Sequence, residues 1–156
     1  MSNVAARGFY VITELIESEL IQDTSINTVT YGDISEVDLN KQTIFPLAHV
    51  IVNSITSGER TLTFNVSILT MDIVNVEKQA TSNLYRGNTN EQDILNAQFK
   101  VINKLLQKFR ISTLYRSGYQ IIGDVSFEPF TDRFENMLAG WAATFDIMIT
   151  NDQEVC

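Results

Sequence analysis

Two long apolar runs joined by a short polar turn constrain the fold of this chain more than any other feature. The first run, residues 47–55, is largely apolar on both sides of an extended chain, and the second begins at Thr61. Between them lies Ser57-Gly58-Glu59-Arg60, which has the composition of a turn. Runs of this length joined by so short a turn are typical of antiparallel neighbours. The sequence therefore predicts a β-hairpin, with Pro46 at the start of its first strand.

The second run changes its pattern partway along. Apolar residues alternate from Leu62 to Ile68, and the apolar set then moves to Leu69, Met71 and Ile73. A shift of one residue exchanges the two faces of a strand, so it predicts a β-bulge or a strong bend near Ile68-Leu69. Residues 61–74 would span about 46 Å if fully extended. We expect a strand that curves, or one that leaves the body as a hairpin arm.

Two further segments have the spacing of amphipathic helices. Residues 8–20 place apolar side chains three or four residues apart, and residues 90–110 do so over a longer stretch. In the second helix, Thr89 and Gln92 have the spacing of a capping box. Its predicted buried face consists of Leu95, Ile102, Leu105, Leu106 and Phe109.

The remaining periodic segments are short strands. They cover residues 26–31 (a strand or a strand-like arm), 119–122, 125–130 (separated from the previous one by Gly123-Asp124) and 141–150. Strands grouped around hairpins, with helices outside them, indicate the α+β class. The sequence thus predicts one domain over residues 1–156, with a polar tail at about 151–156. We expect a mainly antiparallel β-sheet with two helices packed on one face, plus the long bent strand or hairpin arm.

Composition and charge exclude several classes of protein. The 156 residues carry 11 Lys and Arg against 19 Asp and Glu, a net charge of −8. Neither half of the chain is basic, so we do not expect a monomer to bind nucleic acid tightly. No apolar run approaches the roughly 20 residues of a membrane-spanning helix, and no leader is evident. The single cysteine, Cys156, leaves no internal disulfide and fits a reducing cytoplasm.

Candidate catalytic and ligand-binding residues are few. The sequence has neither a Gly-Lys-Ser/Thr phosphate loop nor a G-x-G-x-x-G motif. His49 is the only histidine and lies inside an apolar strand, which favours a core or interface position over a catalytic one. Two acidic groups, Asp33/Glu36/Asp38 and Glu128/Asp132/Glu135, lack the spacing of a calcium loop or a fixed carboxylate pair. We therefore expect no enzyme, no cofactor and no metal.

One charge feature is organised. Lys100, Lys104 and Lys108 follow each other at four-residue steps along the second helix, and Arg110 comes next. The row has two interpretations. It is a solvated helix face whose cations suit the helix C-terminus, or it is a patch that meets an acidic surface of a neighbouring subunit. Self-association through such unlike patches is head to tail and closes into a ring when the rotation permits.

Several stretches of the C-terminal half have a distinctive sequence and order. They are Asn90–Asn96 (NEQDILN), Val101–Leu106 (VINKLL), Glu128–Asn136 (EPFTDRFEN) and the ending from Ala139-Gly140-Trp141 through Phe145-Asp146-Ile147 to Cys156. In these stretches the chain resembles a structural protein of tailed bacteriophages. Its order of elements resembles the tail-terminator and head–tail joining proteins that form the phage neck ring.

The resemblance implies a function in assembly. A small subunit of this family forms a homo-oligomeric ring, for which we expect 6 or 12 copies, that caps or connects the tail tube. Its partners are copies of itself and the neck, portal or tail proteins. It would be made in the host cytoplasm and reside in the virion, without contact with a membrane. DNA would pass through the lumen without specific binding, because acidic walls repel phosphate.

The predicted oligomer interface combines the charged row with the expected arms. Residues 61–74 and 77–90 are the expected intersubunit arms. The predicted interface residues are Lys100, Lys104, Lys108, Arg110, Leu69, Met71, Glu36 and Asp38. The alternative function is a small cytoplasmic ligand-binding or regulatory domain with a pocket on the sheet. A hydrolase that uses acidic residues is the most distant hypothesis.

Overall fold

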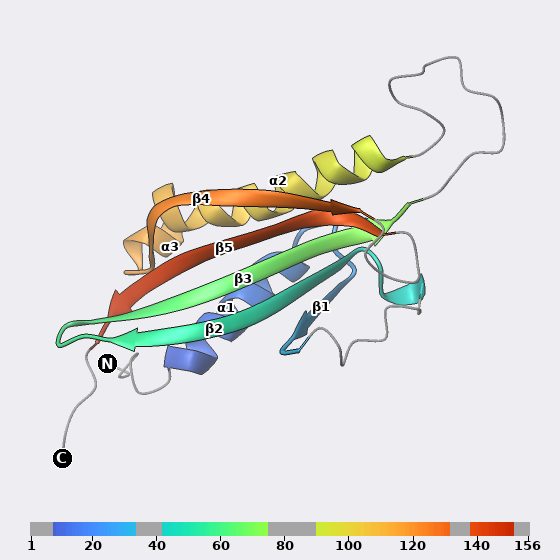
Figure 1. Ribbon diagram of the computed structural model, residues 1–156. Helices are drawn as coiled ribbons and strands as arrows, with labels where there is room; N and C mark the ends of the chain where they lie inside the picture. Colours follow the sequence, from blue (N-terminus) through green and yellow to red (C-terminus); the bar gives the residue numbers. More distant parts are fainter. Residues whose placement is uncertain (1–7, 34–41, 75–89, 132–137, 152–156) are drawn as a thin grey trace, which may run out of the picture.

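A five-stranded sheet with two long helices on one of its faces forms the body of the protein (Figure 1). The computed structural model describes residues 8–33, 42–74, 90–131 and 138–151. The elements are α1 (Gly8–Ile21), β1 (Thr28–Tyr31), a short 3-10 helix (Gln42–Ile44), β2 (Leu47–Ser57), β3 (Thr61–Ile73), α2 (Glu91–Ile111), α3 (Thr113–Arg116), β4 (Gln120–Thr131) and β5 (Leu138–Thr150). The α+β class and the mainly antiparallel sheet are confirmed.

The strands follow the order β1-β2-β3-β5-β4. β1 runs parallel to β2, and the other neighbouring pairs are antiparallel. The two helices divide the covered face between them. α1 contacts β1 and β2, whereas α2 contacts β3, β5 and β4. α1 therefore covers the part of the sheet near the β1 edge, and α2 covers the part near the β4 edge (Figure 1).

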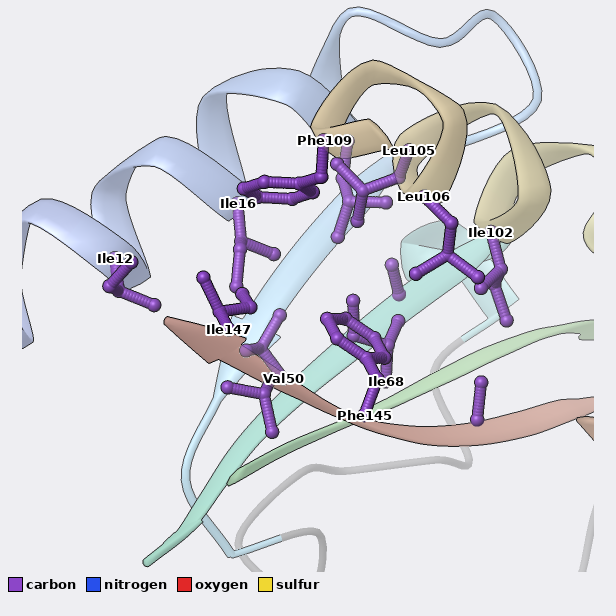
Figure 2. Packing of buried hydrophobic residues seen from close by; sticks show 14 of the residues in the cluster. Ile12, Ile16, Val50, Ile68, Ile102, Leu105, Leu106, Phe109, Phe145 and Ile147 are labelled. Atoms are coloured by element: carbon purple, nitrogen blue, oxygen red, sulfur yellow. The ribbon is translucent and has the colours of Figure 1, made fainter. Parts of the chain in front are cut away.

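The main core lies between this helix layer and the sheet. Ile12 and Ile16 of α1 point toward the sheet, with Ile16 beside Phe109 of α2, and all three side chains are fully buried (Figure 2). Burying one such side chain contributes about 1.5–3 kcal/mol. The sheet meets them with apolar side chains from its three central strands. These side chains include Val50, Phe64, Val66, Ile68, Phe145 and Ile147.

β3 is buried on opposite faces at its two ends. Its even-numbered side chains face the helices, while Met71 joins a second cluster on the helix-free face. The predicted bulge at Ile68-Leu69 is wrong, because β3 pairs in continuous register with β2 and β5 there. The change of phase in the sequence marks the second cluster instead. That cluster consists of Phe45, Leu47, Met71, Phe130 and Leu138, with Ile44, Leu69 and Ile73 packed against it.

The long strand stays within the sheet along its whole length. β3 pairs with β2 on one edge and with β5 on the other, so the prediction of a curving strand holds rather than that of a free arm. β2, β3 and β5 curve together in Figure 1. The irregularity of the hairpin lies in β2, between Val52 and Ser54. The other expected arm, residues 77–90, lies outside the described residues, apart from Asn90.

One local prediction needs correction, and a second falls partly outside the described residues. The pieces 119–122 and 125–130 form one strand, β4, in which Gly123 with φ +73° helps to form a bulge between Ile122 and Ser126. The predicted capping box had its first residue at Thr89, which lies outside the described residues. The helix begins at Glu91 after Asn90, whose side chain makes no capping hydrogen bond. Pro129 is tolerated in β4 because this strand is at an edge of the sheet.

Candidate functional site

The basic row on α2 is divided between contacts within the subunit and free surface. Lys108 donates a hydrogen bond from Nζ to Glu19 Oε2 of α1 at 2.5 Å, and both side chains are partly exposed. Arg110 donates to the carbonyl oxygen of Gly123 in the β4 bulge at 3.5 Å. Two of the four predicted basic interface residues therefore hold α2 to its own neighbours.

Lys100 and Lys104 differ from these two residues. Both side chains are exposed, and neither forms an ion pair with any residue in the described ranges. They line a cavity of about 480 Å³ between α2 and residues 23–25, which follow α1. Asn96 and Asn103 line the same cavity, and Asp23 accepts a hydrogen bond from the Ser25 N–H at 2.9 Å. The cavity carries two lysines against one aspartate, so its net charge is positive.

An acidic surface lies on the other side of α1. Glu14 and Glu17 are exposed and line a second cavity of about 220 Å³ between α1 and the β1 edge. The wall of this cavity contains Val29, Thr30 and Tyr31 of β1. Tyr31 packs edge-to-face against Phe9, at 5.8 Å between ring centroids. One subunit thus presents a basic cavity on the α2 side of α1 and an acidic, partly aromatic cavity on its β1 side.

The remaining predicted interface residues fall in two places. Met71 is fully buried in the second cluster, and Leu69 packs against that cluster in a half-buried position. The structure therefore gives Met71 a role in folding the subunit rather than a place on its surface. Glu36 and Asp38 lie outside the described residues, as do Asp132, Glu135 and Cys156.

His49 joins β2 to the edge strand β1. Its Nδ1 lies 2.7 Å from Thr30 Oγ1, and its Nε2 lies 2.7 Å from the Gly32 carbonyl oxygen. A carbonyl oxygen can only accept, so Nε2 carries the proton and Nδ1 accepts from the threonine hydroxyl. Burial lowers the pKa of His49, while the bond to Gly32 and the charge of Asp33 oppose that shift. The side chain is fully buried, in agreement with the predicted core position.

The helix-free face of the sheet carries a polar network that the sequence reading missed. Asn53 Nδ2 donates to Asn65 Oδ1 at 2.9 Å and to Ser67 Oγ at 2.8 Å. Asn65 in turn donates to Asp146 Oδ1 at 2.9 Å, and Ser67 bonds Thr144 at 2.8 Å. The signal in the sequence was the polar alternation of two strands, but their pairing register was needed to bring the residues together.

The buried titratable groups of the described residues lie apart from the two charged cavities. Within those ranges no group of three or more His, Cys, Asp and Glu side chains could hold a metal ion, and no helix could span a membrane. Asp72 is half-buried and accepts a hydrogen bond from the Ile73 N–H at 2.7 Å. Burial raises the pKa of Asp72, and that hydrogen bond partly opposes the shift. Neither His49 nor Asp72 lines the basic or the acidic cavity.

Neither a protein-family model nor a curated protein sequence matches the chain. The basic cavity beside α2 and the acidic cavity beside α1 are therefore the features on which a functional proposal can be based.

Proposed function

We propose that the chain is a non-enzymatic structural subunit that forms a homo-oligomeric ring at the neck or tail of a tailed bacteriophage. Its role there would be that of a tail terminator or head–tail connector. The observation that carries the proposal is the separation of charge within one subunit. The basic cavity at Lys100 and Lys104 and the acidic cavity at Glu14 and Glu17 share no residue and lie on different sides of α1.

Unlike surfaces of this kind favour head-to-tail contact between identical subunits. Such contacts build a closed ring when the rotation between neighbours divides a full turn, and an open filament when it does not. The resemblance to neck proteins adds the expected location, the partners in the neck, portal or tail, and the passage of DNA through the lumen. An overall charge of −8 also suits a channel through which DNA slides without sticking.

The alternative is a small ligand-binding or regulatory domain. Ligand pockets are mostly apolar and usually measure about 300–1,000 Å³. The cavity beside β1 is smaller than that range, and the larger one is lined by two lysines, an aspartate and asparagine amides. Their linings suit contact with another macromolecular surface better than enclosure of a small molecule.

The test is the mass of the purified protein, measured by native mass spectrometry and light scattering at several salt concentrations. Negatively stained particles would be imaged with the protein alone and with neck, portal and tail proteins of the same virus added. We expect rings of 6 or 12 subunits. A protein that stays monomeric with every partner, or that stops at a two-fold dimer, would overturn the proposal and direct attention to ligand screening.

A further inference from the structure

We propose that the basic cavity of one subunit is the docking surface for α1 of a second copy, with Glu14 and Glu17 of that copy pairing with Lys100 and Lys104. This inference rests on the proposed function and names the contact by which neighbouring subunits join.

The spacing of the charged residues matches across the two surfaces. Lys100 and Lys104 are one helical turn apart on α2, and Glu14 and Glu17 are about one turn apart on α1. Residues three or four apart on a helix have Cβ atoms about 5–6 Å from each other. Two helices laid side by side can therefore form both ion pairs at once. Asn96 and Asn103 line the same cavity and offer amide groups to the incoming helix.

The same helix pair already makes one such contact within the subunit. Lys108 of α2 pairs with Glu19 of α1, so the lysine comes from α2 and the glutamate from α1, as in the proposed contact. α1 ends at Ile21, and the cavity beside Lys100 and Lys104 is lined by residues 23–25 instead of by α1 itself. The acid that lines this cavity, Asp23, already accepts the Ser25 N–H. Lys104 also lines a smaller cavity with Glu19 of α1, but Glu19 already pairs with Lys108. Lys100 lines the cavity that contains no residue of α1, where a second copy can supply acids.

The acidic surface also supplies apolar area to the contact. Tyr10 and Tyr31 are exposed beside Glu14 and Glu17, and Phe9 packs edge-to-face against both rings. Ion pairs at a surface are screened by salt, with a Debye length of about 8 Å at physiological ionic strength. We therefore expect the contact to weaken as salt increases without being abolished, because the aromatic contribution does not depend on charge.

The test exchanges charges between the two surfaces. The variants are K100E/K104E, E14K/E17K and the fourfold swap that combines them, all assayed by native mass spectrometry against the wild-type ring. A matched control, R60E/R116E, changes two exposed arginines away from both cavities and alters the net charge by the same amount as K100E/K104E. Circular dichroism and the melting temperature verify that each variant is folded.

We expect each double variant to raise the concentration at half-assembly at least tenfold, while the control stays within about twofold of wild type. The fourfold swap should assemble again, because opposite charges face each other once more. An equimolar mixture of the two double variants should also assemble, with the two variants alternating around the ring. This mixture keeps the test valid if the fourfold variant fails to fold.

The possible failures are distinct. A wild-type protein that never assembles contradicts the proposed function itself. A wild-type ring that K100E/K104E leaves unchanged contradicts only this contact. If both double variants disrupt the ring but neither the fourfold swap nor the mixture restores it, the two surfaces do not touch each other, and the contact is likewise wrong.

Discussion

Thr30 and His49 occupy paired positions on the parallel strands β1 and β2, and a 2.7 Å hydrogen bond joins their side chains. The same imidazole donates to the Gly32 carbonyl just after β1. One buried side chain therefore fastens both the middle and the end of the short edge strand. This contact makes the stability of the β1 edge depend on the protonation state of His49.

The stability of the protein should fall as the pH drops below about 6.5. Burial lowers the pKa of His49 in the folded state, so below the ordinary histidine value the unfolded chain binds the extra proton more readily. The contribution of His49 is complete above about pH 6.5 and is lost as the pH falls toward the lower, folded pKa. Urea unfolding at pH 5 and pH 8 measures the difference. His49→Phe should cost about 1–3 kcal/mol at pH 8, because Thr30 and Gly32 lose a buried partner.

The control for this prediction is the comparison of wild type with the His49→Phe variant at both pH values. His49→Phe should show less change in unfolding free energy between pH 5 and pH 8 than wild type, since the titrating group is gone. An equal change in both proteins would show that other groups cause the pH dependence.

Asp72→Asn should stabilise the protein at neutral pH. Burial raises the pKa of Asp72, so the folded state penalises the charged form. This penalty is absent below about pH 3.8 and grows as the pH rises through the folded pKa, as the linkage relation requires. The asparagine keeps an oxygen that can accept the Ile73 N–H. Chemical unfolding at pH 7 should therefore give a higher midpoint for the variant. Asp124→Asn, at an exposed site in β4, should leave the midpoint unchanged.

The ion pair between Lys108 and Glu19 should contribute modestly to folding. Its side chains are 29% and 18% exposed, so solvent screens the interaction. A double-mutant cycle with Lys108→Met and Glu19→Gln should give a coupling energy of about 0.2–1 kcal/mol. Lys104→Met, which breaks no ion pair in the described residues, should change stability by less than about 0.5 kcal/mol. A larger loss at Lys104 than at Lys108 would contradict this division of the lysine row.

Gly140→Ala should destabilise the sheet strongly. A Cβ atom at this position in β5 would collide with the backbone of Thr70 in β3, which cannot move without breaking the ladder between the two strands. We expect a loss of about 3 kcal/mol or more, measured by thermal unfolding. Ala142→Gly in the same strand should cost only about 0.5–1 kcal/mol, through backbone entropy. Equal losses for the two changes would rule out the close approach of the two backbones as the cause.

Local periodicity in the sequence predicted the helices and strands. The features that it missed depend on which strands pair with each other. The spacing of Ile12, Ile16 and Leu20 identified α1, because a helix buries residues three and four apart. The phase change after Ile68 was attributed to a bulge, although it results from a second buried cluster. Both features shift the alternation of apolar residues in one strand in the same way. The partner strands that distinguish the two cases are far away in the sequence.

The candidate site could be predicted only in part. The row of lysines was visible because it follows the helical repeat. Its division was not, since only the packing of α1 against α2 brings Glu19 to Lys108 and leaves Lys104 beside residues 23–25. The acidic cavity was missed because Glu14 and Tyr31 belong to different elements, which meet only in the folded sheet.

The burial of β2 decreases from its start to the hairpin turn, and this gradient has a consequence for hydrogen exchange. Residues 47–50 of β2 are buried, whereas every residue from Asn53 to Ser57 is exposed. Separating the end of β2 from β3 would uncover little apolar surface, whereas separating its beginning would expose both clusters. Amide hydrogens should therefore exchange quickly near the turn and progressively more slowly toward Leu47, down to the rate set by global unfolding. Protection from exchange would therefore increase gradually along β2, from the turn to the start of the strand.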